Sequence, residues 1–422
     1  MRRKDLDRGC NIADRRQVAI TGLGIISCIG RGLSEVASSL KSGGSGIVLD
    51  EERRPRFRSA LTGRILGFSP RDYGLSLKAL RTMCEPAQYA YAATRDAVLD
   101  ASLKPEDVSS PRCGLVFGND SCVKPAVEAI DILRSTGKTH FIGASKAFQL
   151  MSSTVSMNLA ASFKIQGANW TISAACASGT HALGQGVILI RSGMQDMVLA
   201  GGAQELNWYS MASFDALQVM SVRHDDPAAA SRPFDADRDG LVPSGGAACL
   251  VLEDLQHAQA RGARVYGLLA GYGFSSDASG GLTQPSPAGA ARAMRMALAD
   301  AHVNPDQIDY INAHATSTLL GDRAEACAIA EVFGSRTPVS STKSMTGHEC
   351  WMSGASEAVY TSLMARDSFM APNLNFRRLD EDCPVINVIN QTREAPVRLA
   401  VSNSFGFGGT NSAIVLDFRR QF

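Results

Sequence analysis

The amino-acid sequence predicts an α/β protein in which helices cover the faces of buried strands, because strand-like and helix-like segments alternate along the chain. A second observation is a weak internal repeat: residues 93–108 and 293–308 each read as a helix, a proline-containing turn and the start of an apolar strand. The composition, with 45% hydrophobic and 20% charged residues among 422, indicates a globular protein with a large core. We therefore expect two similar halves that pack tightly together.

Buried strands are predicted where apolar and β-branched residues run together between glycines or turn residues. Four such runs are residues 18–26, 113–118, 197–202 and 248–253. A helix is predicted over 87–103, after a proline that a first helical turn tolerates. The polar, proline-containing stretch that follows ends this helix and leads into the next strand.

The two copies of the repeat are identical at six positions, which are Ala93/Ala293, Arg95/Arg295, Ala97/Ala297, Asp100/Asp300, Ala101/Ala301 and Pro105/Pro305. Duplication of one helix-turn-strand unit within the chain would explain these identities. Convergence is the open alternative, because alanine and aspartate are common residues. With duplication, the chain divides into a flexible arm over 1–16, a first half over 17–258 and a second half over 259–422.

Charge and cysteine content exclude several classes of protein. The 42 basic and 41 acidic residues nearly cancel, so we expect no nucleic-acid binding. No apolar run reaches the about 18 residues of a membrane span, so we expect no membrane insertion. Ten cysteines without a C-x-x-C spacing or a preceding secretory signal predict a reducing, cytoplasmic location.

Three motifs resemble cofactor or metal sites but are incomplete. The dinucleotide fingerprint lacks its third glycine after Gly24. A calcium-type loop that starts at Asp235 has Gly246 where a bidentate glutamate is required. A zinc-protease motif lacks its second histidine after Glu349. The sequence therefore predicts no metal, nucleotide or other cofactor.

Cys176 is a candidate nucleophile at a predicted turn from strand to helix. Residues 169–173 read as a strand, and residues 177–192 carry apolar side chains at helical spacing. A helix N-terminus supplies free N–H groups and positive potential, which favour the thiolate. A buried structural cysteine is the alternative, and the neighbouring motifs decide between the two.

Two histidines and a lysine follow predicted strands in the second half. His314 ends an apolar strand, where open α/β sheets place their sites, although a structural histidine is the alternative. A further strand-like start at 338 leads to Lys343 and His348. Glu357 follows on a helix-like segment and would pair with Lys343 if both are buried, whereas an exposed lysine would be solvated.

The segment 402–411, SNSFGFGGTN, is expected to form a glycine-rich loop, because its three glycines and two phenylalanines suit neither a helix nor a central strand. Its N–H groups can turn toward a ligand, and Phe405 or Phe407 can close an apolar pocket. A plain turn before a last strand over 412–418 is the alternative.

Together these segments resemble the β-ketoacyl-acyl-carrier-protein synthases, the elongating condensing enzymes of the thiolase superfamily. The resemblance runs from VAITGLGIIS at 18–27 to SNSFGFGGTNSAIVL at 402–416 and includes SAACASG, NAHATST and STKSMTGH in that order. It implies a five-layer αβαβα sandwich of two duplicated halves. It also implies an acyltransferase for decarboxylative Claisen condensation in fatty acid elongation, with acyl- and malonyl-loaded carrier proteins as partners and a homodimeric state.

The same resemblance implies a role for each residue of the motifs. Cys176 would carry the acyl chain as a thioester, while His314 and His348 would hydrogen-bond the malonyl thioester carbonyl. The backbone amides of Cys176 and Phe407 would form the oxyanion hole. The other implied assignments are support at Lys343 and Glu357, substrate contacts at Thr316, Thr318, Phe405 and Phe407, and carrier-protein docking at Lys78, Arg81, Arg134 and Lys138. Ordinary solvated charges are the alternative for the docking residues.

Two departures from the family pattern concern the substrate pocket. Ala315 follows the first histidine, where glycine is common, and ECWM at 349–352 replaces a stretch of small residues. We expect the bulky Trp351 and Met352 to reshape the acyl pocket or the dimer contact, and we predict a nonstandard acyl chain. Two other functions remain open: a ketosynthase of a polyketide or aryl-polyene-type pathway with a heterodimeric partner, and a non-catalytic chain-length-type subunit, against which Cys176 argues.

Overall fold

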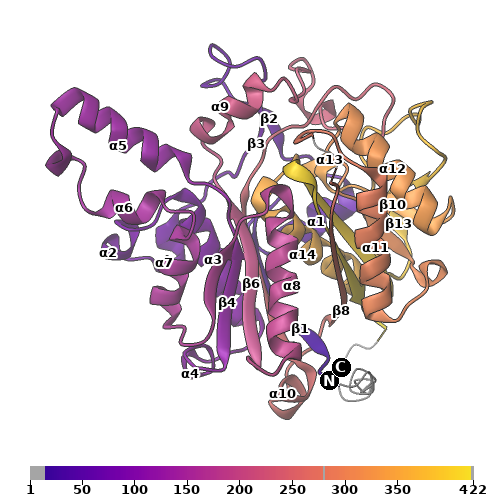
Figure 1. The fold of residues 1–422 in the computed structure, drawn as a ribbon, viewed down its shortest axis with the longest axis horizontal. Coiled ribbons are helices and arrows are strands. Elements are labelled where there is room, and N and C mark those ends of the chain that lie inside the picture. Colours follow the sequence, from indigo (N-terminus) through magenta and orange to yellow (C-terminus); the bar gives the residue numbers. More distant parts are fainter. Residues whose placement is uncertain (1–14, 279–280, 420–422) are drawn as a thin grey trace, which may run out of the picture.

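The computed structural model describes residues 15–278 and 281–419, and its central feature is one mixed sheet of 11 strands (Figure 1). In order across the sheet, the strands are β12 (Asn387–Val388), β10 (Pro338–Ser340), β9 (Tyr310–Asn312), β14 (Leu399–Gly406), β15 (Thr410–Asp417), β8 (Gly267–Ser276), β1 (Val18–Ile26), β7 (Gly246–Asp254), β6 (Met197–Gln204), β4 (Cys113–Gly118) and β5 (Asn169–Ile172). The two halves meet where β1 pairs with β8.

Helices form three further layers around the two halves of this sheet. Helices α3 (Glu85–Asp100) and α7 (Thr154–Phe163) cover the outer face of the first half. Helices α8 (Ser178–Arg191) and α14 (Ser353–Arg366) lie between the halves and contact strands of both. The outer face of the second half carries α11 (Pro287–Ala301) and α12 (Leu319–Phe333). The five-layer sandwich expected from the resemblance is confirmed (Figure 1).

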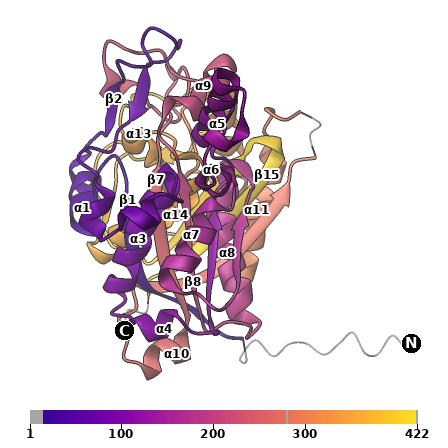
Figure 2. The ribbon, with the colours of Figure 1, turned by 90° about the vertical axis from the view of Figure 1, so that its left-hand side faces the viewer.

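Shorter elements surround these layers. The remaining helices are α1 (Leu33–Ser42), α2 (Leu77–Leu80), α4 (Pro105–Val108), α5 (Val123–Thr136), α6 (Ser145–Leu150), α9 (Trp208–Ala216), α10 (Leu255–Ala260) and α13 (Lys343–Thr346). Two small ribbons pair β2 (Ile47–Leu49) with β3 (Leu61–Gly63), and β11 (Phe369–Met370) with β13 (Arg393–Glu394). The 3₁₀ turns are η2 (Pro70–Tyr73), η3 (Thr139–Phe141), η4 (Ala175–Ala177), η5 (Pro227–Ala229), η6 (Pro305–Gln307), η7 (Cys350–Met352) and η8 (Phe407–Gly409). Figure 2 shows α9 and β2 at one end of the molecule and α4 and α10 at the other.

Close contact between a strand and an outer helix is repeated in the two halves. A Cβ atom at Gly24 of β1 would lie 1.9 Å from the carbonyl oxygen of Ala93 in α3. A Cβ atom at Gly273 of β8 would lie 2.1 Å from the carbonyl oxygen of Ala293 in α11. Only glycine permits either approach. The alanine identities of the internal repeat therefore reflect one packing arrangement used twice.

The shared aspartates of the repeat also have one structural role. Asp100 accepts a hydrogen bond from the backbone N–H of Leu23 at 2.9 Å, and Asp300 accepts one from Tyr272 at 2.9 Å. Each aspartate thus binds the strand at the residue between two glycines. This matched geometry favours duplication over convergence.

The predicted strands and helices are largely confirmed, with one clear error. The strands over 18–26 and 113–118 have the predicted bounds, whereas the helix predicted over 87–103 ends at residue 100. The loop expected over 402–411 is confined to residues 407–409, which form η8. The expectation is wrong for the rest, because residues 410–411 belong to β15 and residues 402–406 belong to β14, which pairs with β9 and β15 in the buried sheet. Small side chains are required there, since the hydroxyls of Ser404 and Thr180 in α8 lie 2.7 Å apart.

The N-terminal arm predicted over 1–16 lies outside the described residues up to residue 14. Arg15 forms an ion pair with Asp300, and Arg16 forms one with Asp196. Among the helices of residues 15–278 and 281–419, none has the length and apolar character needed to cross a membrane.

Candidate active site

A short turn between β5 and α8 holds the sulfur of Cys176. The turn is η4, and Ala175 adopts the left-handed conformation with φ of 46°. The hydroxyl of Ser178 stabilises the turn, because it accepts from the N–H of Ala174 at 2.8 Å and donates to the carbonyl of Ala175 at 2.6 Å. Cys176 is 5% exposed, so the strained turn aims a buried sulfur at the space between the halves.

His314 follows β9, and the buried carboxylate of Glu325 on α12 fixes its backbone. The N–H groups of His314 and Ala315 donate to the two oxygens of Glu325 at 2.9 and 2.6 Å. Asn403 of β14 donates to the same carboxylate at 2.9 Å. Sequence reasoning missed Glu325. Its signal was an acidic side chain among alanines on a helix just after the histidine motif.

His348 follows α13 through a glycine that the backbone requires. Gly347 has φ of 69°, and a Cβ atom there would lie 2.6 Å from the carbonyl oxygen of Val242. The Nδ1 atom of His348 receives the backbone N–H of Cys350 at 3.3 Å and lies 3.2 Å from the hydroxyl of Ser353. Because Nδ1 accepts, the proton of the neutral ring resides on Nε2.

The three reactive side chains from the two halves meet in one buried cluster. Nε2 of His348 lies 3.0 Å from Sγ of Cys176, and its proton points at the sulfur. The rings of His314 and His348 have centroids 5.3 Å apart and an interplanar angle of 85°. Nδ1 of His314 is buried and has no hydrogen-bond partner in the described part of the chain. One thiol therefore faces two imidazoles, and one ring nitrogen is left for a ligand.

Burial keeps this cluster uncharged. It raises the pKa of the Cys176 thiol to about 12, although the ammonium of Lys343 and the backbone amide of Phe407 lower it. Burial also lowers the pKa of His314 and His348 well below the ordinary imidazole value, and Lys343 adds to this effect. The loss of solvation therefore opposes the effect that favours the thiolate at a helix N-terminus.

Lys343 and Glu357 form an ion pair beneath the two histidines. Their side chains are 2% and 1% exposed, so the lysine is not a solvated surface charge. Burial raises the pKa of the Glu357 carboxyl, while the ammonium of Lys343 acts in the opposite direction. Thiol and imidazole are zinc-binding types, but the nearby ammonium opposes a cation in this cluster.

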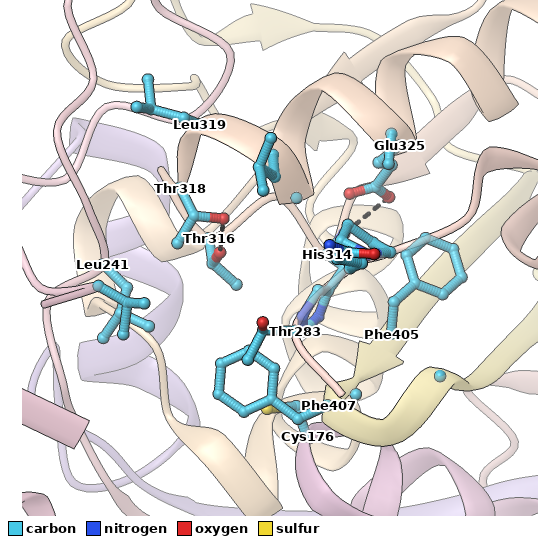
Figure 3. Close-up of a pocket in the computed structure, with 18 of the residues that line it drawn as sticks. Cys176, Leu241, Thr283, His314, Thr316, Thr318, Leu319, Glu325, Phe405 and Phe407 are labelled. Carbon is cyan, nitrogen blue, oxygen red and sulfur yellow. Dashed lines mark hydrogen bonds between the residues drawn. The ribbon is translucent and has the colours of Figure 1, made fainter. Parts of the chain in front are cut away.

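A cavity of about 250 Å³ reaches the sulfur from the surface. It is lined by the reactive cysteine and histidines and by the four side chains predicted to contact substrate. Figure 3 shows Cys176 and His314 together with these four, which are Thr316, Thr318, Phe405 and Phe407. The hydroxyls of Thr316 and Thr318 lie 3.0 Å apart. Lys343 and Glu357 do not line the cavity. The charge of Lys343 nevertheless lowers the pKa of the cysteine and of both histidines that do.

The four basic residues predicted for carrier-protein docking are exposed and lie away from the sulfur. They form two pairs, with Lys78 and Arg81 on or next to α2, and Arg134 and Lys138 at the end of α5. Arg134 is 3.7 Å from Asp131, a contact of little energetic weight at 77% exposure.

The two departures from the family pattern have different surroundings. Ala315 is 1% exposed and packs in the apolar cluster around α11 and α12. Glu349 is buried, and its carboxylate accepts hydrogen bonds from Ser27 and Tyr360. Trp351 is buried in the same apolar cluster as Cys176, although it does not itself line the cavity.

Comparison with known proteins places this site in a family. Residues 15–258 match "Beta-ketoacyl synthase, N-terminal domain", and residues 266–377 match "Beta-ketoacyl synthase, C-terminal domain". The chain belongs to the β-ketoacyl synthase family. It is 44% identical over 405 residues to 3-oxoacyl-[acyl-carrier-protein] synthase 1 of Haemophilus influenzae, covering 95% of this chain and 98% of that protein.

Solved structures agree with the family assignment. The crystal structure of a β-ketoacyl synthase from Burkholderia phymatum has a TM-score of 0.91 and 36% identity, covering 96% of this chain and 100% of that one. A type II polyketide ketosynthase, AntDE, solved with its acyl carrier protein AntF and bound to the hexaketide, has a TM-score of 0.85 and 32% identity, covering 96% and 99%.

Proposed function

We propose that this chain is a 3-oxoacyl-acyl-carrier-protein synthase, which joins an acyl chain on Cys176 to a malonyl unit with loss of CO₂. The observation that carries the proposal is the Nε2 atom of His348, which lies 3.0 Å from the Cys176 sulfur beside a second neutral imidazole. Identity of 44% to 3-oxoacyl-[acyl-carrier-protein] synthase 1 of Haemophilus influenzae supports the same chemistry.

In the first half-reaction, the thiol of Cys176 attacks the thioester of the acyl-loaded carrier protein. A new C–S bond forms at Cys176, the old one breaks, and the proton of the thiol ends on the pantetheine sulfur that leaves. The backbone amides of Cys176 and Phe407 are the proposed donors to the tetrahedral oxyanion, since both also lower the pKa of the sulfur. One lost donor of this kind typically costs about 3–4 kcal/mol.

In the second half-reaction, the malonyl thioester loses CO₂ and leaves an enolate. Two neutral N–H donors suit the enolate oxygen, and His348 carries its proton on the nitrogen that faces the sulfur. His314 offers the second ring. The enolate carbon then attacks the acyl thioester, the C–S bond to Cys176 breaks with its electron pair on the sulfur, and the resulting thiolate takes up one proton from solvent. Thr316 and Thr318 are the proposed contacts for the pantetheine arm.

Incubation of the purified chain with acyl- and malonyl-loaded carrier proteins tests this function. We expect an acyl adduct on the peptide that contains Cys176 and release of CO₂ that depends on both carriers. The measurement is mass spectrometry of the peptide together with trapped CO₂. No adduct and no CO₂ would favour a non-catalytic partner subunit, and products extended repeatedly without reduction would favour a polyketide ketosynthase.

We also propose that the chain forms a homodimer through β5. This strand is the end of the 11-stranded sheet, and Trp170 on it is 40% exposed. The neighbouring segment exposes further large apolar side chains, which are Phe141, Phe148, Leu150 and Met151. An unpaired edge beside an apolar surface is a liability unless a second strand covers it, and two copies of β5 can pair about a twofold axis.

Trp170→Lys is expected to convert the dimer to a monomer, because a charge would be buried at the centre of the strand pairing. Sedimentation velocity at micromolar concentration measures the change. Val385→Lys is the matched control, since Val385 is 73% exposed beside β12 at the opposite end of the sheet. A Trp170→Lys protein that remains dimeric would exclude this interface.

Two further assignments complete the proposal. We propose a cytoplasmic location, because the nine cysteines of the described residues are free thiols, the state that a reducing compartment maintains. We also propose that the exposed Lys78, Arg81, Arg134 and Lys138 attract an acidic carrier protein through local, salt-sensitive charge.

A further inference from the structure

A buried apolar cluster includes the reactive cysteine, and its other side chains have no part in the chemistry described so far. We call it the Trp351 cluster. Its buried members are Cys176, Met211, Met220, Leu241, Cys350 and Trp351, and the partly buried side chains packed against them are Phe57, Ala175, Phe214 and Val219. An acyl chain attached to Cys176 needs apolar surroundings of this kind.

The Trp351 cluster continues the substrate cavity. Phe214, Val219 and Leu241 belong to the cluster and also line the cavity beside Cys176. Trp351 is not among the lining residues. The ring centroid of Phe214 lies 6.1 Å from that of Phe407 and 6.2 Å from that of Trp351. A chain that extends from the sulfur past the two phenylalanines therefore meets Trp351.

Some side chains of the cluster can yield to a ligand. Met211 and Met220 are unbranched and adapt their shape readily. Phe214 lies on α9 and is only partly buried. Rotation of these side chains makes room next to the sulfur for the first part of an acyl chain.

Trp351 cannot yield in the same way, because its backbone is confined. Its carbonyl oxygen would lie 3.1 Å from a Cβ atom at Gly179 of α8 and 2.9 Å from one at Gly202 of β6. The turn η7 that carries it leads directly into the buried helix α14, and Trp351 is 5% exposed. The indole is thus a rigid wall behind a deformable lining.

We propose that Trp351 sets the upper limit on acyl-chain length, so that this site takes short acyl groups. The inference rests on the proposed function for the identity of the substrate, and on the Trp351 cluster for its length. Trp351 is a specificity residue in this scheme. It limits the thioester formed on Cys176 without contributing a proton or a hydrogen bond to the reaction.

The test compares acyl-enzyme formation across carrier proteins loaded from butyryl to palmitoyl. For each variant, the measurement is the ratio of long-chain to short-chain adduct on the Cys176 peptide, which does not depend on the folded fraction. We expect the ratio to fall steeply with length in the parent chain. Trp351→Ala should raise the long-to-short ratio by about tenfold or more, and Trp351→Leu should raise it by less.

Trp351→Phe is the matched control, because it keeps a bulky aromatic ring and removes the pyrrole part of the indole, whose N–H is buried without a partner in the described residues. It should retain the short-chain profile. A parent chain that loads palmitoyl as readily as butyryl, or a Trp351→Ala profile equal to that of the parent, would overturn the proposal.

A second probe separates this proposal from the proposed function. Alkyl methanethiosulfonates of increasing chain length modify the Cys176 thiol directly and need no carrier protein. If no acyl-enzyme forms at all, the proposed function fails. A length cut-off in the alkyl series that Trp351→Ala removes would still support Trp351 as the residue that limits chain length. The absence of a length cut-off in the alkyl series would refute the role of Trp351 as the length limit, whether or not the enzyme condenses its substrates.

Discussion

Cys176→Ala is expected to abolish condensation, with a loss on the order of 10⁴-fold or more, because the covalent intermediate cannot form without the sulfur. The amides, histidines and cavity would remain in place, so substrate binding should survive. The measurement is the rate of β-ketoacyl product formation, with quantitative mass spectrometry of the acyl adduct. A variant that retains both adduct and rate would remove Cys176 from the mechanism.

Cys327→Ala is the matched control for this loss. Cys327 lies on α12, is partly exposed and has a free thiol in the same half as the histidines. Its replacement should leave both the adduct and the rate unchanged. An equal loss in this variant would show that any cysteine change perturbs the fold.

Lys343→Met is expected to destabilise the fold by about 3–5 kcal/mol, because Glu357 would lose its only described cationic partner in a buried site. Urea unfolding measures the change. The double variant Lys343→Met/Glu357→Leu should be more stable than the sum of the single effects predicts, since no buried charge is then left alone. Simple additivity would contradict a direct pair.

The same variant also tests the electrostatic role of the pair. The ammonium of Lys343 lowers the pKa of His314 and His348, so its removal should raise both. Neutral imidazoles are the active form in the proposed mechanism, and they are lost as pH falls through the pKa. The acid limb of kcat against pH should therefore move to higher pH in Lys343→Met. An unmoved limb would limit Lys343 to a structural role.

Local patterns in the sequence predicted the strands well, but they could not predict how deeply each segment is buried in the fold. The bounds of β1 and β4 can be located in the sequence from continuous apolar runs, because both faces of these strands are buried. The same small residues that suit a loop also suit β14, whose neighbours leave little space. The pairing of Lys343 with Glu357 was predicted as conditional on burial, and only the three-dimensional structure supplies that condition.

The reactive cluster was only partly visible in the sequence for a related reason. The motifs at Cys176, His314 and His348 are local and could be located one by one. Glu325 and the tautomer of His348 depend on contacts between segments that are distant in the chain. The pKa of the thiol also depends on burial by those segments, which an argument from the helix N-terminus alone does not include.

The two halves repeat one strand-on-helix arrangement, yet each supplies a different part of the reactive cluster. The thiol comes from the first copy and both imidazoles come from the second. Neither half on its own therefore holds the complete reactive cluster, and the chemistry depends on how the two halves pack against each other.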